Sequence, residues 1–249
     1  MNMTQPLVLV SNDDGYRALG VTTLAQVLRE HFRVVICAPE NEQSASSHAL
    51  SLNRPLRVEA HAEGVYSVDG TPADSVYIAL NEKSVLPERP VLVVSGMNHG
   101  PNLGQDVFYS GTVAAAREAA LQGIPALAVS AHAEANLLAA CQDVARLALR
   151  MTELFRGVPC LFNANYPPGS SWSHQATRAG RRVYSGGLVG RFDPRGRPYY
   201  WIGGDSVHHV GASGTDTIAF EEGVVGITPL NLDLWSPSLE EAAQHLCDL

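Results

Sequence analysis

An apolar run leads directly into an acidic loop in Leu7-Val8-Leu9-Val10-Ser11-Asn12-Asp13-Asp14-Gly15. The run has no polar residue between Pro6 and Ser11, which is typical of a strand buried on both faces of a parallel sheet. Open α/β sheets bind ligands at the carboxyl ends of their strands, and Asp13 and Asp14 would lie there. A nucleotide-binding first turn normally offers backbone amides to phosphate, whereas this turn offers negative charge. We therefore expect a cation between these carboxylates and a phosphate, in a metal-dependent enzyme that acts on a phosphate ester.

Strand-like and helix-like segments alternate through the first half of the chain. Apolar runs predict strands at 7–10, 34–37, 56–58, 65–68, 91–95 and 125–130. Helical spacing of apolar residues, or helix-forming composition, predicts helices at 20–32, 72–81, 112–122 and 133–155. The second of these helices has a sequence typical of a helix start, with Thr71 as N-cap and Pro72 at the first helical position. This alternation predicts an α/β fold with a mostly parallel sheet and helices on both faces.

The pattern changes after about residue 163. From there to residue 228, prolines, glycines and aromatics interrupt short strand-like pieces, including 199–202, and a short amphipathic helix is expected at 239–249. Such a segment suits a β-rich extension or a dimerisation arm better than another strand–helix–strand unit. We therefore divide the chain into a catalytic core, 1–162, and a β-rich C-terminal extension packed on it, 163–249.

Composition limits the possible functions. The 249 residues carry a formal net charge of −8, which argues against a large nucleic-acid footprint and requires an anionic substrate to be held locally. Residues 1–6 contain no basic residue, the following apolar run is too short for a signal peptide, and no stretch has the length of a membrane span. The four cysteines lack C-x-x-C spacing and are expected to be reduced. These features predict a cytoplasmic enzyme.

Polar loops follow several of the predicted strands and should meet at one edge of the sheet. They supply carboxylates, hydroxyls and amides from Asn12, Asp13, Asp14, Ser44, Asn98 and Asn102, and Ser110, Gly111 and Thr112 begin a helix beside them. Carboxylate, hydroxyl and amide oxygens are hard ligands that suit Mg²⁺ or Mn²⁺. The helix N-terminus can bind phosphate through N–H groups and hydroxyls. The sequence thus contains the parts needed for phosphoester hydrolysis.

Each of these signals also has a purely structural interpretation. An Asp-Asp-Gly sequence is a common turn, and Asn98 and Asn102 are residue types that support turns. Ser110 and Thr112 are most simply helix-capping residues, a role compatible with phosphate binding nearby. His99 is a candidate for proton transfer, with a bystander role as the alternative.

Several motifs, taken in order along the chain, together resemble the SurE family. They include Ser11-Asn12-Asp13-Asp14-Gly15, Ala38-Pro39 with Gln43-Ser44, Gly70-Thr71-Pro72-Ala73-Asp74, Ser95-Gly96-Met97-Asn98 with Gly100 and Asn102, Tyr109-Ser110-Gly111-Thr112-Val113 and Asn163-Ala164-Asn165-Tyr166-Pro167. The resemblance spans nearly the whole chain. It implies a Rossmann-like three-layer core with a β-rich C-terminal part used to form a homodimer or homotetramer, often through exchanged arms. It also implies hydrolysis of nucleoside 5′- and 3′-monophosphates, with some activity on short polyphosphate.

The resemblance also implies a site. By motif position, the family's metal ligands fall on Asp13, Asp14, Ser44 and Asn98, which would hold one Mg²⁺ or Mn²⁺ per subunit. Our hypothesis makes Asp13, Asp14 and Asn98 catalytic, with Asp14 the first choice for general base. The residues expected to contact the substrate or its phosphate are Asn12, Ser44, Asn102, Ser110, Gly111 and Thr112. The departures from the family pattern, at Leu19, Ser75 and Met97, touch none of the proposed ligands.

Two other functions remain open from the residues. A phosphatase with a covalent intermediate on Asp14 or Ser44 is one, although the loop lacks the Asp-x-Asp and lysine that the aspartyl version usually needs. The other is a nucleotide-binding or sensing protein without turnover. A dinucleotide oxidoreductase is disfavoured because G-x-G-x-x-G is missing and the first loop is acidic.

Overall fold

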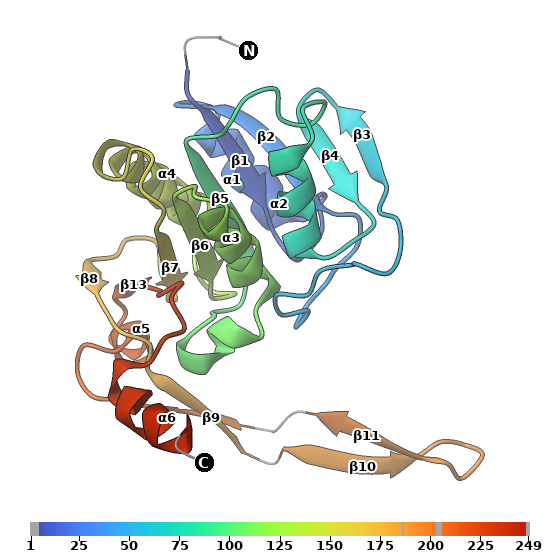
Figure 1. The fold of residues 1–249 in the computed structure, drawn as a ribbon, viewed down its shortest axis with the longest axis vertical. Coiled ribbons are helices and arrows are strands. Elements are labelled where there is room, and N and C mark those ends of the chain that lie inside the picture. The colour runs from blue at the N-terminus through green and yellow to red at the C-terminus, as the bar shows by residue number, and fades with distance from the viewer. Residues whose placement is uncertain (1–4, 186, 203–205, 248–249) are drawn as a thin grey trace.

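A single nine-stranded sheet runs through the centre of the protein, in the order β3-β4-β2-β1-β5-β6-β7-β13-β8 (Figure 1). The computed structural model describes residues 5–185, 187–202 and 206–247. The strands of this sheet are β1 (Leu7–Ser11), β2 (Arg33–Pro39), β3 (Val58–Ala62), β4 (Val65–Val68), β5 (Leu92–His99), β6 (Ala126–Ala131), β7 (Leu161–Tyr166), β8 (His174–Ala176) and β13 (Val225–Pro229). All neighbouring strands are parallel except the pairs β3–β4 and β7–β13.

Helices cover both faces of this sheet. On one face α1 (Leu19–Leu28) packs beside α4 (Leu137–Leu154), and on the other α2 (Pro72–Asn81) packs beside α3 (Gly111–Leu121) (Figure 1). Each pair closes its own hydrophobic core, because the buried strands present apolar side chains to both faces. The predicted α/β class, with a three-layer core and a mostly parallel sheet, is confirmed.

The helix starts follow from local capping chemistry. The Oγ1 of Thr71 accepts a hydrogen bond from Asp74 N at 3.0 Å, and the Asp74 carboxylate accepts one from Thr71 N at 2.9 Å. This reciprocal pair is a capping box, which confirms Thr71 as the predicted N-cap. Helix α4 begins later than the sequence pattern indicates, because the Asn136 side chain accepts a hydrogen bond from Ala139 N at 3.0 Å and caps the helix there.

The order of the strands creates a switch point beside β1. The chain moves from β1 outward to β2 and then to the β3–β4 pair, and returns to place β5 on the other side of β1. The connections after β1 and β5 therefore diverge to opposite faces of the sheet. In open α/β sheets a ligand crevice forms at this position, outside the carboxyl ends of the strands.

The C-terminal part has two roles in the architecture. Strands β13 and β8 extend the core sheet, and the boundary expected between residues 162 and 163 lies inside β7. Strands β9 (Arg181–Ser185) and β12 (Ser206–Val210) pair with each other, and the hairpin of β10 (Leu188–Phe192) and β11 (Pro198–Ile202) projects away from the rest (Figure 1). The remaining elements are α5 (Asp216–Glu221), α6 (Glu240–Cys247) and two short 3₁₀ turns, η1 (Gly104–Phe108) and η2 (Pro237–Leu239). The extra C-terminal strands are thus present, while their use in oligomerisation stays a prediction.

The described part of the chain contains neither a disulfide nor a helix long and apolar enough to cross a bilayer. All four cysteines are free, and Cys37 and Cys141 lie buried in the core. Burial raises the pKa of both thiols to about 12, so neither is a reactive thiolate.

Helix α1 packs closely on the end of β5 at Gly20. A Cβ atom added at Gly20 would lie 2.0 Å from the carbonyl oxygen of Met97, directly before Asn98. We expect Gly20→Ala to lower the free energy of unfolding by about 1–3 kcal/mol, measured by urea denaturation. The control Gln26→Ala, at an exposed position of the same helix, should change it by less than about 0.5 kcal/mol. Equal stability of the two variants would contradict this packing.

Candidate active site

A cavity of about 420 Å³ opens at the carboxyl ends of β1 and β5. Loops after β1, β2 and β5 and the β9 strand surround it. The lining consists of Asp13, Asp14, Glu42, Ser44, Ala45, Asn98, His99, Gly100, Pro101, Asn102, Asp106, Tyr109, Ser110, Arg182 and Tyr184. Six of the nine sequence-predicted site residues are in this set. Asn12, Gly111 and Thr112 are not, and they lie behind the cavity wall.

The loop after β1 is fixed by its own side chain and by the loop after β2. Asn12 Nδ2 donates to Gly15 O at 3.0 Å, so this amide shapes the acidic turn from within. Gln43 N donates to Asp13 O at 2.7 Å, and Tyr16 N donates to Pro39 O at 3.0 Å. These bonds bring the acidic loop and the serine-containing loop to one place.

Asp13 is buried against the N-terminus of α3. Thr112 Oγ1 donates a hydrogen bond to Asp13 Oδ1. A Cβ atom added at Gly111 would lie 2.7 Å from the Asp13 Cβ, so only glycine permits this close approach without displacement. Burial raises the pKa of Asp13 to about 6; the Thr112 hydrogen bond opposes this rise and the charge of Asp14 adds to it.

Asp14 is less buried than Asp13 and faces the cavity. Burial is the main reason that its pKa is raised; a hydrogen bond with the His99 backbone opposes the rise, and the charge of Glu42 adds to it. Two adjacent, partly desolvated carboxylates repel each other. A bound cation would relieve both the repulsion and the desolvation cost.

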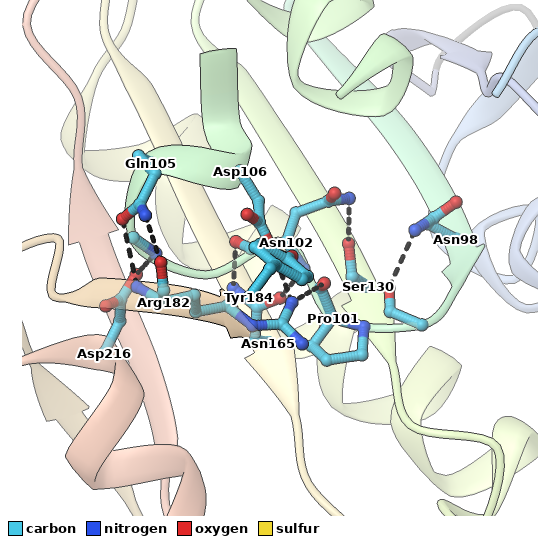
Figure 2. A network of polar contacts seen from close by, with 12 residues as sticks. Asn98, Pro101, Asn102, Gln105, Asp106, Ser130, Asn165, Arg182, Tyr184 and Asp216 are labelled. Atoms are coloured by element: carbon cyan, nitrogen blue, oxygen red, sulfur yellow. Dashed lines mark hydrogen bonds and ion pairs between the residues drawn. The ribbon is translucent and has the colours of Figure 1, made fainter. Parts of the chain in front are cut away.

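Asn98 and Ser44 add two candidate neutral oxygen ligands to the two carboxylates. Asn98 Nδ2 donates to Gly100 O at 2.7 Å (Figure 2), so its Oδ1 is left as an acceptor. Ser44 Oγ donates to Glu42 Oε1 at 2.8 Å, so the oxygen lone pairs of this hydroxyl are also available. Among the described residues no group of three or more His, Cys, Asp or Glu side chains could hold a metal. The donors that line the cavity, two carboxylates with an amide and a hydroxyl oxygen, are of the type that hard divalent cations prefer.

Asn102 and Ser110 line this cavity, as does Ser44, and all three are among the residues predicted to contact the substrate or its phosphate. Ser110 is the N-cap of α3, and its Oγ accepts a hydrogen bond from Val113 N at 3.1 Å. Asn102 is held from behind by strands β6 and β7. Its Nδ2 donates to Ser130 Oγ at 3.0 Å, and its N donates to Asn165 Oδ1 at 2.7 Å (Figure 2).

The structure adds residues that sequence reasoning missed, namely Glu42, Asp106, Arg182 and Tyr184. Arg182 and Tyr184 come from β9, in the segment that the sequence pattern marks as an extension. Their spacing is the available signal, because residues two apart in a strand project to the same face. Nothing in the sequence, however, predicts that this strand lies beside the acidic loop.

Two other cavities bear on the choice of site. One of about 460 Å³ lies at the opposite end of the sheet, near Pro6 and Pro125, and lacks a pair of carboxylates. Another, of about 320 Å³, shares Asp14, Asn98 and His99 with the cavity described above. Its further lining is mostly apolar and comes from Ala18, Leu19, Gly20, Met97, Ala131, His132, Ala133, Ala135 and Leu137. The chemistry of the lining, not cavity size, identifies the candidate site.

Comparison with known proteins gives consistent matches. The family model described as "Survival protein SurE" matches residues 8–186. A protein from Sorangium cellulosum (strain So ce56) named "5'-nucleotidase SurE" is 53% identical over 97% of this chain and 93% of its own length. A protein of the same name from Anaeromyxobacter dehalogenans (strain 2CP-C) is 49% identical over 91% of this chain and 90% of its own. The crystal structure of the SurE protein from Aquifex aeolicus matches with a TM-score of 0.84 at 33% identity, covering 98% of this chain and 100% of that one.

The buried charge of Asp13 predicts a pH-dependent cost in stability. Because its folded-state pKa of about 6 lies above the ordinary 3.8, the metal-free protein loses stability as the pH rises between these values. In metal-free protein at pH 7.5, we expect Asp13→Asn to raise Tm by roughly 5 °C over wild type. The difference should shrink toward zero near pH 4, as followed by calorimetry.

Glu30→Gln, at an exposed carboxylate, serves as the control and should leave Tm nearly unchanged at both pH values. A difference between Asp13→Asn and wild type that stays the same at both pH values would contradict the buried-charge explanation.

Proposed function

Because the chain belongs to the SurE family, we propose that it is a divalent-metal-dependent phosphatase that hydrolyses nucleoside 5′- and 3′-monophosphates. Short polyphosphate is included as a further substrate. The observation that carries the proposal is the meeting of Asp13, Asp14, Ser44 and Asn98 in one cavity beside the start of α3. Relatives named 5′-nucleotidase, matched over nearly their whole length, support the nucleotidase part.

In this proposal Asp13, Asp14, Ser44 and Asn98 hold one Mg²⁺ or Mn²⁺ per subunit. When bound, such an ion neutralises phosphate charge and lowers the pKa of a coordinated water. Asp13 is the fixed member of the set, because Thr112 holds one of its carboxylate oxygens. Asp14, which is more accessible, accepts the proton of the attacking water.

The phosphate lies between these ligands and the N-terminus of α3. The Ser110 Oγ accepts from Val113 N, so the hydroxyl hydrogen remains free to donate to a phosphate oxygen. The partial positive charge at the start of the eleven-residue helix adds to this interaction and strengthens as charge develops in the transition state. Asn102, fixed by Ser130 and Asn165, offers a second polar contact.

The nucleoside occupies the adjoining apolar cavity. Because the two cavities share Asp14, Asn98 and His99, a phosphate ester held at the acidic loop can extend from one into the other. Leu19, Met97 and Leu137 give the second cavity the apolar surface that a nucleobase needs. His99, at the junction, is the candidate donor of a proton to the leaving oxygen.

The projecting hairpin is the proposed oligomer contact. Phe192, Tyr200 and Trp201 expose large aromatic surfaces on its two strands. By the strand register Phe192 and Tyr200 lie on one face of the hairpin and Trp201 on the other, so both faces offer apolar surface to a partner. We accordingly propose a homodimer or homotetramer that uses this arm.

The central experiment is phosphate release after treatment with EDTA. A panel of 5′- and 3′-nucleoside monophosphates would be assayed with Mg²⁺, Mn²⁺ or no metal restored. We expect no release without metal and full release when either Mg²⁺ or Mn²⁺ is added back. Asp14→Asn should remain folded by circular dichroism and lose turnover to background.

Other outcomes separate the alternative functions. Tight nucleotide binding without phosphate release at any metal would favour a nucleotide-binding or sensing protein. A labelled phosphoenzyme trapped on Asp14 or Ser44 would favour the covalent mechanism. Full activity of both Asp13→Asn and Asp14→Asn would remove the metal-site proposal.

A further inference from the structure

Several carboxylates surround the site, so the phosphate group of a substrate needs a source of positive charge there. The carboxylates of Asp13, Asp14, Glu42 and Asp106 all line the cavity. Even with one divalent cation bound, the carboxylates outweigh the positive charge of the cation and the side chains. A phosphate dianion entering this cavity needs a further cationic contact, since the net charge of −8 gives no long-range attraction.

Arg182 is the one permanently cationic side chain among the described residues that line the cavity. Its side chain is only 14% exposed, and it forms an ion pair with Asp106 through Nη1. The same Nη1 also donates to Pro101 O at 3.3 Å (Figure 2). The Nε atom is buried and has no hydrogen-bond partner among the described residues. Because Nη1 has two acceptors and Nε is buried, the Nη2 hydrogens are the donors that remain for a ligand.

The backbone at Arg182 is fixed independently of its side chain. Gln105 accepts a hydrogen bond from Arg182 N at 3.0 Å through Oε1, and its Nε2 donates to Arg182 O (Figure 2). Asp216 accepts from Gly104 N at 2.9 Å and from Gly180 N at 2.6 Å, so it ties the start of β9 to the start of η1. These contacts hold β9 beside η1 in addition to the ion pair between Arg182 and Asp106.

Tyr184 adds a neutral donor beside the same carboxylate. Its hydroxyl donates to Asp106 Oδ2 at 2.6 Å, and its ring lies 5.5 Å from the guanidinium carbon of Arg182 (Figure 2). Asp106 thus accepts from both β9 side chains. The guanidinium is thus paired with an internal carboxylate, and its unpaired N–H groups can donate hydrogen bonds to an anion in the cavity.

We propose that Arg182 binds the phosphate group of the substrate, as a cation supplied by the C-terminal part of the chain. The inference rests on the proposed function for its substrate class. Asp106 stays paired with Nη1, and phosphate oxygens accept hydrogen bonds from the Nη2 donors. Arginine suits this task because its planar fork of donors is permanently charged and can bind an anion at Nη2 while Nη1 stays on Asp106.

The test measures binding of inorganic phosphate to the full chain loaded with Mg²⁺, by isothermal titration calorimetry. A second readout is the release of nucleoside, which is measured by chromatography while added phosphate competes with the substrate. Arg182→Gln should weaken phosphate binding by at least about tenfold. Arg182→Lys should fall between the wild type and this variant, because it keeps the charge and loses the fork.

Two variants separate substrate binding from a structural role. Arg181→Gln removes an exposed arginine on the opposite face of β9 and should bind phosphate as the wild type does. Asp106→Asn keeps the shape, and an acceptor for Tyr184, while it removes the negative charge beside the guanidinium. Phosphate binding to this variant should be unchanged or tighter.

The measured phosphate affinities distinguish direct binding by Arg182 from a purely structural role of this residue. Equal phosphate binding by Arg182→Gln and Arg181→Gln would overturn the inference, even if wild-type nucleotidase activity is found. A loss of binding in Asp106→Asn as large as in Arg182→Gln would also overturn it, because the ion pair would then matter only for structure. Arg182-dependent phosphate binding without nucleotide turnover would instead uphold the inference and contradict the proposed function.

Discussion

The burial of the Asp13 carboxylate against the first turn of α3 is the constraint on which the site depends. A carboxylate loses hydration there, and among the described residues the Thr112 hydroxyl is its one side-chain donor. Gly111 makes the approach possible, since a Cβ atom at this position would collide with Asp13 itself. The loop after β1 and the helix after β5 are therefore locked together at a charged group. A divalent cation at this point would turn an unfavourable buried charge into a favourable contact.

Much of this arrangement could be predicted from the sequence because it depends on local rules. The buried strand before Asp13, the capping box at Thr71 and the alternation of strands and helices each have a short-range signature. These signatures place Asp13 and Asp14 at the carboxyl edge of a parallel sheet, where the structure has them. Ser44 and Asn98 came from the family motifs, and the structure places both on the same cavity wall. What they bind there remains a prediction.

The rest could not be predicted because it depends on long-range pairing. Thr112 has the sequence context of a helix-capping residue, but only the packing of α3 on the first loop aims its hydroxyl at Asp13. Arg182 lies in an irregular stretch of prolines, glycines and aromatics whose local pattern does not reveal a partner. Its position is set by side chains distant in sequence, Gln105 and Asp216. The division of the chain into core and extension was based on a change in composition. Composition does not indicate which residues of the two parts come into contact.

The two hydrogen bonds accepted by Asp216 also concern the order of events during synthesis. The chain emerges from the ribosome N-terminus first, and domains generally fold as units. Asp13, Asp14, Ser44 and Asn98 emerge long before Asp216, which lies 112 residues after Gly104 and accepts hydrogen bonds from both Gly104 and Gly180. The wall that carries Arg182 can be fastened only after Asp216 has been translated. The cavity therefore acquires its cationic side only with the last third of the protein, and a prematurely terminated product would lack the completed wall.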